Sequence, residues 1–368
     1  MMYTVEIEND GERTVINSPD TEYRVSGTYT KAKNKIPSCT FNIYPDNPGY
    51  NKLSEYKTLV RIYDPTADDE ERQKFGGRII LIEGKVDSTG FYKTVTCEGW
   101  LGYFKDTINY LYSAINGMTE NIPVNQVVYQ FVRWHNENCS NGHDFDIDSF
   151  ATTDTIGEYS PSADKSSFDA LTDENLTKYL NYDVTEYLGK DGNMKRKLCC
   201  NKGLNEAGDT IIRLGENMQS LTVANNFDNI CTRVIPMTKD GALMGTLGID
   251  TVWVDDVEAI KKFGVITKMH TFDYLSKTKS LAKAGKNWLN SNSKVTRTIT
   301  VNCLDLFDID VTPDSFEIYS TYLIDCPELG ISERLELTQL TRDINETWNT
   351  QLTFGEILYS ARSYKSLK

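Results

Sequence analysis

The chain has 368 residues, and its 53 Asp and Glu against 39 Lys and Arg give a formal net charge of −14. Phosphate affinity depends on clustered Lys and Arg, so this balance argues against a protein that binds nucleic acid or an anionic membrane surface. The 21 Tyr, 14 Phe and 5 Trp argue against disorder. At about 100–200 residues per domain, the length predicts two to four domains.

Neither a membrane anchor nor a secretion signal is expected. No apolar run approaches the roughly 18 residues of a membrane helix, and Met1–Glu6 lack a charged-then-apolar leader. No Cys-x-x-Cys pair occurs among the eight cysteines, and adjacent Cys199 and Cys200 suit neither a disulfide nor paired zinc ligation. We therefore expect a soluble protein folded in the cytosol, with free thiols that pack as small apolar residues.

Residues 3–100 alternate apolar and polar side chains in short runs separated by Gly, Pro, Asn and Asp, which predicts antiparallel β-strands. The expected strands are Thr40–Tyr44, Leu59–Tyr63, Gly77–Glu83 and Tyr92–Glu98. The acidic stretch Asp68–Glu71 predicts a solvated hairpin tip, and Asp87–Gly90 a turn. We expect a meander of strands that closes on itself.

The pattern changes after Asp106. Val124, Val127, Val128, Phe131 and Trp134 recur at helical spacing after Pro123, which predicts an amphipathic helix to about Asn136. The apolar residues from Phe168 to Leu180 predict a second helix. A strand pair is expected next, through Val184 and Tyr187, a turn at Gly189–Gly192 and Arg196–Cys200. The long polar loop His143–Lys165 separates the two helices in sequence.

The β pattern returns at Thr210. Gly241–Gly248 is glycine-rich and predicts the boundary of an insertion, and Asp273–Leu289 a short surface helix. The expected strands lie at 211–214, 221–223, Thr232–Met237, Val295–Leu304, Phe316–Ile318, Tyr322–Ile324, Arg334–Leu340 and Gln351–Phe354. Thr94–Cys97 resembles Ile299–Cys303, which raises the possibility that the first and last β units are duplicates.

The sequence shows no recognisable catalytic or metal-binding motif. Its histidines are His135, His143 and His270, without a His-Glu-x-x-His or Gly-x-Ser-x-Gly pattern. Cys139 lies between His135 and His143, and a cysteine nucleophile needs a nearby base. However, His135 ends a predicted helix and the other two lie in polar loops, so we favour surface or capping roles for all three.

The sequence also lacks the motifs of a calcium site and of a phosphate-binding loop. Asp144, Asp146 and Asp148 alternate, but Ser149 and Thr155 stand where a calcium loop needs Gly and Glu, so an acidic face of a strand or loop is the better interpretation. Neither Gly241–Gly248 nor Gly208–Gly215 has the pattern of a phosphate-binding loop. A carboxylate pair for glycoside hydrolysis remains open, because nothing singles one out. We therefore predict no catalytic residues, no cofactor and no metal ligands.

Four groups of residues, in a shared order, carry a resemblance to a known family. They are Leu59–Asp64 with Phe75–Ile79 and Lys93–Asp106; His135-Asn136; Arg213–Met218 with Thr232–Met237; and Val254–Asp256 with Ala259-Ile260, Phe263-Gly264 and Thr300–Leu306. Together they resemble the phage tail hub family, also called prophage tail endopeptidase or tail-associated lysin N-terminal regions. Two departures are Thr238-Lys239, where the family often has Gly-Lys, and Cys303, where Ala is common.

This resemblance implies a mainly β fold with α+β insertions, in which two tube-like antiparallel β-barrels per chain assemble as a trimeric pseudo-sixfold ring. Residues 1–105 would form the first barrel, 106–207 an α+β accessory domain, 208–240 with 295–368 the second barrel, and 241–294 a small inserted α+β domain. Many members continue into a cell-wall peptidase or glycosidase, which is absent or left out beyond Lys368.

The implied function is that of a non-enzymatic hub at the tip or baseplate of a phage tail, made in the host cytoplasm. Its partners would be two further copies, distal tail protein, tail tube rings, tape measure protein and downstream tip or receptor-binding proteins. DNA would pass without binding, and we expect part of the excess carboxylate to line the channel and repel it. The alternatives are a tail-associated cell-wall hydrolase with its active site in this chain, and a carbohydrate-binding adhesin.

Overall fold

The computed structural model describes residues 2–67, 72–88, 90–108, 122–150, 154–156, 165–201, 207–245, 250–272, 277–308 and 315–360. The chain divides into two compact units. Unit 1 contains residues 1–220, 302–324 and 333–352, and unit 2 contains 221–301, 325–332 and 353–368. Within the described residues, no helix is long and apolar enough to cross a membrane.

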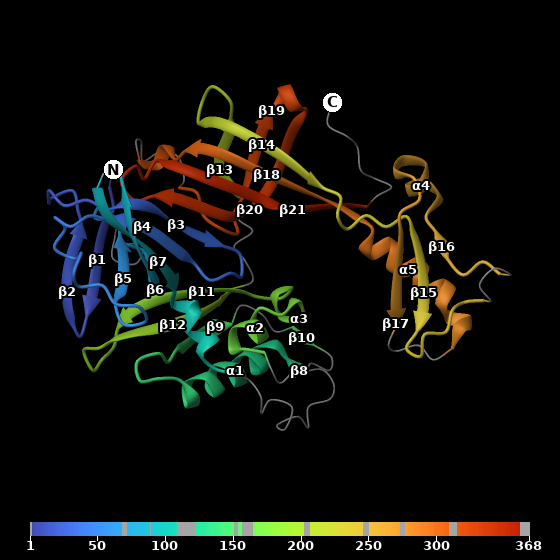
Figure 1. The fold of residues 1–368 in the computed structure, drawn as a ribbon, viewed down its shortest axis with the longest axis horizontal. Coiled ribbons are helices and arrows are strands. Elements are labelled where there is room, and N and C mark those ends of the chain that lie inside the picture. Colours follow the sequence, from blue (N-terminus) through green and yellow to red (C-terminus); the bar gives the residue numbers. More distant parts are fainter. Residues whose placement is uncertain are drawn as a thin grey trace. The chain divides into compact units, whose positions relative to one another are not determined.

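The N-terminal part of unit 1 is an antiparallel β-sheet (Figure 1). Its strands are β1 (Thr4–Asn9), β2 (Glu12–Asn17), β3 (Ser26–Ala32), β4 (Ser38–Ile43), β5 (Leu59–Tyr63), β6 (Gln73–Asp87) and β7 (Gly90–Gly99). They lie in the order β3-β4-β7-β6-β5-β1-β2. Alternation places one face of each strand in the core, as with Cys39, Phe41 and Ile43 of β4.

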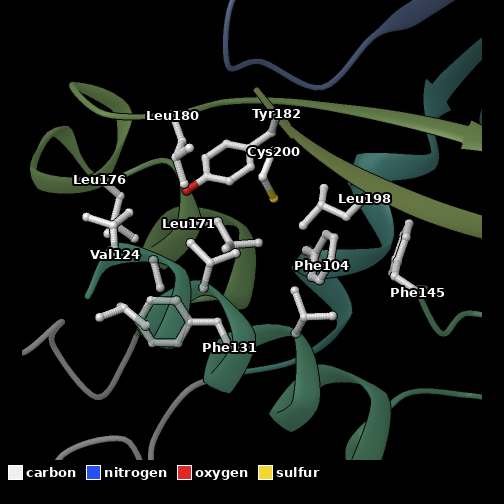
Figure 2. Close-up of a cluster of buried hydrophobic side chains, with 14 of the residues drawn as sticks. Phe104, Val124, Phe131, Phe145, Leu171, Leu176, Leu180, Tyr182, Leu198 and Cys200 are labelled. Carbon is white, nitrogen blue, oxygen red and sulfur yellow. The ribbon is translucent and has the colours of Figure 1, made fainter. Parts of the chain in front are cut away.

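An α+β module follows in the same unit. Its elements are η1 (Trp100–Asp106), β8 (Ile122–Pro123), α1 (Val124–Asn138), β9 (Asp146–Phe150), β10 (Thr155–Ile156), α2 (Ser167–Leu171), α3 (Glu174–Thr177), β11 (Asn181–Leu188) and β12 (Met194–Asn201). Figure 2 shows its core, in which Phe104, Phe131, Leu171 and Leu198 from helices and a strand gather with Phe145 from the loop before β9. Val124, Val127, Val128 and Phe131 of α1 are buried as their spacing predicts, whereas Trp134 is only half-buried and Val132 and His135 are buried instead.

The same sheet continues from β3 through β20, β21, β18 and β14, in that order. Each of these four strands has residues in both units. The C-terminal elements are β13 (Ala207–Arg213), β14 (Met218–Asn226), β18 (Lys294–Leu304), η4 (Leu306–Asp308), β19 (Thr321–Cys326), η5 (Pro327–Leu329), β20 (Ile331–Asp343) and β21 (Asn349–Ser360). Strand β13 pairs with β19, and β19 also with β20. The predicted mainly β fold is confirmed.

The rest of unit 2 is a small α/β subdomain. It contains β15 (Arg233–Thr238), β16 (Val254–Asp255), α4 (Val257–Phe263), β17 (Thr267–Phe272), η3 (Thr278–Ser280) and α5 (Leu281–Asn292). The strand order is β16-β15-β17, and α5 packs on this sheet. A Cβ on Gly285 of α5 would lie only 3.2–3.3 Å from Val254, Pro236 and Val234, so this glycine lets the helix approach closely.

Several local predictions need correction. Phe316–Ile318 is not a strand, because Phe316 is buried and its N–H donates to the carboxylate of Asp305, which bends the segment. The helix expected from Phe168 to Leu180 is two short helices, since α2 ends at Leu171. Helix α5 begins only at Leu281. The acidic stretch Asp68–Glu71 lies outside the described residues.

Candidate functional site

A buried ionic cluster lies between the N-terminal sheet and the α+β module of unit 1. Arg61 of β5 donates to Glu186 of β11 over 2.8 and 3.2 Å, and also to Glu8 over 2.7 Å. The side chains of Arg61 and Glu186 are 2% and 0% exposed. Burial alone would lower the pKa of Arg61, but the hydrogen bonds and charge of Glu186 outweigh it and raise the pKa, so the guanidinium is held charged.

A second arginine extends the cluster. Arg78 of β6 donates to Glu98 over 2.7 and 2.9 Å and to Asp106 over 2.7 and 2.8 Å. Its guanidinium lies between the rings of Tyr56 and Tyr103, 4.9 and 4.8 Å from their centroids. We use the name ionic cluster for Arg61, Glu186, Arg78 and Glu98 together with the nearby rings of Tyr56, Trp100 and Tyr103.

Aromatic rings fill the space between these charges. Arg196 of β12 lies 4.0 Å from the centroid of Trp100, and the Tyr103 ring stacks on His143 at 3.9 Å with an interplanar angle of 7°. Burial, followed by the charge of Arg78, lowers the pKa of His143. The cluster has matched charges and a filled interior, so it fixes the geometry between two modules and offers no evident place for a substrate.

The nearest approach to a catalytic constellation is also buried. His135 Nε2 donates to the backbone carbonyl of His143 over 3.0 Å, so Nδ1 accepts from Thr107 Oγ1 at 2.8 Å. The Thr107 hydroxyl in turn contacts Ser167 Oγ at 2.6 Å. His135, Thr107 and Ser167, whose side chains form this network, are 0–4% exposed, and burial lowers the pKa of His135. This network is satisfied internally and closed to solvent.

The histidine predictions were therefore wrong for His135 and for the loop position of His270. His135 was expected at the surface, but it lies in the core because its position continues the apolar face of α1. His270 lies in β17 rather than in a loop, and its ring stacks on Trp288 at 4.8 Å. Cys139 lies just beyond α1, and burial raises the pKa of its thiol, so it is not activated as a nucleophile.

The predicted acidic strand is present as β9. A hydrogen bond from Tyr187 to Asp146 raises the pKa of the phenol to about 12, and Lys197 lies 3.9 Å from Asp148. Among the described residues there is no group of three or more His, Cys, Asp or Glu that could hold a metal ion. All eight cysteines are free, and all but Cys139 and Cys199 are buried.

Two cavities in the described structure are small. One of about 240 Å³ is lined by Ile7, Asn9, Glu12 and Lys52 among others, and another of about 200 Å³ by Asn125, Tyr129 and Phe150 among others. Both are smaller than the roughly 300–1,000 Å³ of typical ligand pockets. Neither contains the ionic cluster or His135.

An apolar surface lies instead on the β6–β7 hairpin. Val86 and Phe91 face each other across the strand pair and are 70% and 65% exposed. They share a face with Ile82 and Val95, which pack in or against the core, so this face continues outward as an apolar tip. We call Val86 and Phe91 the hairpin tip.

The motif residues of the resemblance prove to be structural anchors. Gly77 and Arg78 pair in register with Gly99 and Glu98, and a Cβ on Gly77 would lie 2.0 Å from the Glu98 carbonyl. The other motif residues form hydrogen bonds from their side chains to the backbone. Asn136 bonds to both the N–H and the carbonyl of Phe145, and Asn217 bonds to the Arg213 N–H and the Ile211 carbonyl in β13. The Thr232 hydroxyl donates to the Gly264 carbonyl and accepts from the Ile266 N–H, and Asp256 caps α4. Arg61 lies within the motif Leu59–Asp64, but its burial was not predicted, and Glu186 was not singled out, because a charged residue in a strand gives no local sign of burial.

The two segments that suggest a duplication, around Cys97 and Cys303, share some local features. Cys97 of β7 and Cys303 of β18 are both fully buried, and each strand is followed by a short 3-10 helix. Directly after β18, Asp305 pairs with Arg342 of β20, with both side chains at most 4% exposed. Arg78 pairs with Glu98 at the end of β7 in a comparable way.

Comparisons with known proteins agree with these observations. Residues 205–364 match the model of the family described as Prophage endopeptidase tail. The 43 kDa tail protein of prophage MuSo2 from Shewanella oneidensis shares the fold, with a TM-score of 0.58, 9% identity and coverage of 99% of this chain and 100% of that chain. A tail protein from Neisseria meningitidis MC58 has a TM-score of 0.57 at 14% identity, over 99% of this chain and 100% of that chain.

The prophage tail protein gp18 from Listeria monocytogenes EGD-e gives a TM-score of 0.50 at 11% identity, over 95% of this chain and 94% of that chain. No curated protein matches the sequence. The predicted resemblance to phage tail proteins is confirmed: residues 205–364 match the prophage endopeptidase tail family, and the chain shares its fold with solved tail proteins.

Proposed function

We propose that this chain is the hub of a phage or phage-like tail, three copies of which close or continue the tail tube at its distal end. The family match over residues 205–364 is the observation that carries the proposal, and the tail-protein fold supports it. In this proposal residues 1–105 form one tube-like barrel and residues 208–240 with 295–368 a related one. The paired features of β7 and β18 support that duplication.

The role is structural and connects tail tube rings and distal tail protein to the tip, with DNA and tape measure protein passing through the channel. A protein under mechanical load needs modules fixed to one another, and the ionic cluster supplies such a joint within unit 1. The formal charge of −14 suits a channel that repels phosphate across a Debye length of about 8–10 Å. A ring structure with a neutral or basic channel wall would contradict this part of the proposal.

The test is the assembly state of the full chain. Light scattering should give about 125 kDa, three times the 41.8 kDa of one chain, and electron microscopy should show rings with a central hole. A monomer at every concentration, including in mixtures with tail tube and distal tail proteins, would overturn the proposal.

The family description includes the word endopeptidase, so a cell-wall hydrolase is the alternative. Peptidoglycan zymography of the chain separates the two, since a structural hub gives no clearing. Clearing that is lost on substitution of Cys139 or His143 would indicate a thiol enzyme. Clearing that survives those changes but is lost on substitution of a glutamate would indicate a glycosidase.

A further inference from the structure

Positive charge is concentrated in one part of this acidic chain. Residues 221–301 contain 11 Lys and Arg against 7 Asp and Glu, a formal charge of +4, whereas the remaining residues carry −18. Residues 274–304 contain six Lys and Arg and no acidic residue. This segment includes helix α5, so the helix lies within the basic region.

Three lysines, one in η3 and two in α5, form a stripe on the side away from the sheet. Leu281, Gly285 and Leu289 are buried against the sheet, and α5 lies beside β15 and β16 (Figure 1). Lys279, Lys283 and Lys286 recur at four- and three-residue spacing and are exposed. We call these three residues the lysine stripe.

The stripe forms no ion pair within the described structure. None of its three lysines forms an ion pair or side-chain hydrogen bond with a described residue, whereas Lys261 on α4 pairs with Glu258 at 2.8 Å. Exposed lysines on a helix are commonly balanced by acidic residues three or four positions away. Three like charges without such partners repel one another, so an acidic surface from outside would stabilise them.

The symmetry of the proposed assembly indicates where that surface comes from. In a three-membered ring each contact is head-to-tail, so a chain needs two different patches that complement each other. A basic stripe on one copy and the acidic remainder of the next copy meet this need. A nucleic acid is a poorer partner, because the −18 of the other residues repels a long polyanion and no exposed aromatic residue lies in the stripe.

We infer that the lysine stripe of η3 and α5 docks on an acidic surface of a second copy of this chain and helps to close the ring. This inference rests on the proposed function, because it names a contact within the proposed trimer. Charge complementarity of this kind fixes the register of an interface and makes its formation depend on salt.

The experiment compares self-association of the full chain with that of K279E/K283E/K286E. Glu has nearly the same helix propensity as Lys, so α5 should remain folded, and circular dichroism checks this. The matched control is K35E/K57E/K190E, which changes the charge equally at exposed lysines outside the stripe. Sedimentation equilibrium at about 50 and 500 mM salt measures the association constants.

The stripe variant should associate at least about tenfold more weakly at low salt, while the control stays within about twofold of wild type. Wild-type association should weaken at high salt. A trimer that both variants form equally well would overturn this inference but leave the proposed function standing. A wild-type chain that never associates would overturn both. If the stripe instead confers binding to single-stranded DNA of about 30 nucleotides, the partner is nucleic acid and the inference is wrong.

Discussion

Arg61 and Glu186 form a bidentate ion pair across 125 residues of sequence, and both side chains are almost completely buried. Glu186 also accepts from Gln73 over 2.8 Å, and Arg196 lies 3.8 Å away. The guanidinium nitrogens of Arg61 and the carboxylate oxygens of Glu186 all have partners, which is the condition for burying these charges without a large penalty. The pair therefore joins β5 to β11 and holds the N-terminal sheet on the α+β module.

The first prediction concerns this joint. Replacement of Glu186 by Ala leaves Arg61 buried without its counter-ion, so it should lower the free energy of unfolding by about 3–5 kcal/mol. Urea denaturation measures the change. The control is Glu137→Ala, which removes an exposed pair with Arg133 and should cost less than about 0.5 kcal/mol. Equal effects of the two substitutions would show that the ionic cluster does not hold the modules together.

Local patterns in the sequence predict strands and helices well in this chain, as at β5, whose bounds Leu59–Tyr63 agree with the prediction. They fail where burial comes from a distant segment. The alternation in β5 shows that Arg61 shares a face with Leu59 and Tyr63, but not that β11 covers that face 125 residues later. For the same reason, the position of His135 at the end of a predicted helix indicates a surface or capping role, although Thr107 and Ser167 enclose its ring.

The candidate site could be predicted only in part. Gly77, Arg78 and Glu98 belong to the motifs that carry the family resemblance, and the structure explains them as one cross-strand contact. The hairpin tip and the lysine stripe carry no motif, since their positions follow from which faces the fold leaves uncovered.

A second prediction tests the cross-strand contact. Gly77→Ala places a methyl group 2.0 Å from the backbone carbonyl of Glu98, which cannot rotate away. The strands must separate, so the free energy of unfolding should fall by at least about 2 kcal/mol. Gly84→Ala in the same strand meets no atom within 4 Å and is the matched control, with an expected change of under about 0.5 kcal/mol. Similar unfolding midpoints for both variants would contradict the close approach.

The third prediction is a pH dependence. Burial lowers the pKa of both His135 and His143, so the unfolded chain binds protons more readily than the folded one. Stability should thus be full above the ordinary histidine pKa of about 6.5 and fall as the pH drops below it, by at most about 1.4 kcal/mol per pH unit for each histidine. Urea titrations between about pH 7.5 and 5.5 follow this loss.

His143→Phe isolates one of the two histidines. Phenylalanine preserves the stack on Tyr103 and removes the titrating group, so the variant should lose part of the wild-type slope between about pH 6.5 and 5.5. Carboxylates also titrate in this range, but they are common to both proteins and cancel in the difference. An unchanged slope would mean that His143 is not protected from protons in the folded state.

The last prediction concerns the hairpin tip and depends on the proposed assembly. Val86 and Phe91 are mostly exposed, so V86S/F91S removes little buried surface from one chain, and its unfolding free energy should change by under about 0.5 kcal/mol. If the tip is buried when tail proteins assemble, the same change should weaken assembly by at least about tenfold, since apolar anchors dominate protein interfaces. Leu188→Ser, at another exposed site, is the control, and light scattering and electron microscopy compare the three proteins. Assembly that is unaffected by V86S/F91S would exclude the tip from the interfaces of the hub, whereas a loss of folding would show that the tip stabilises the single chain.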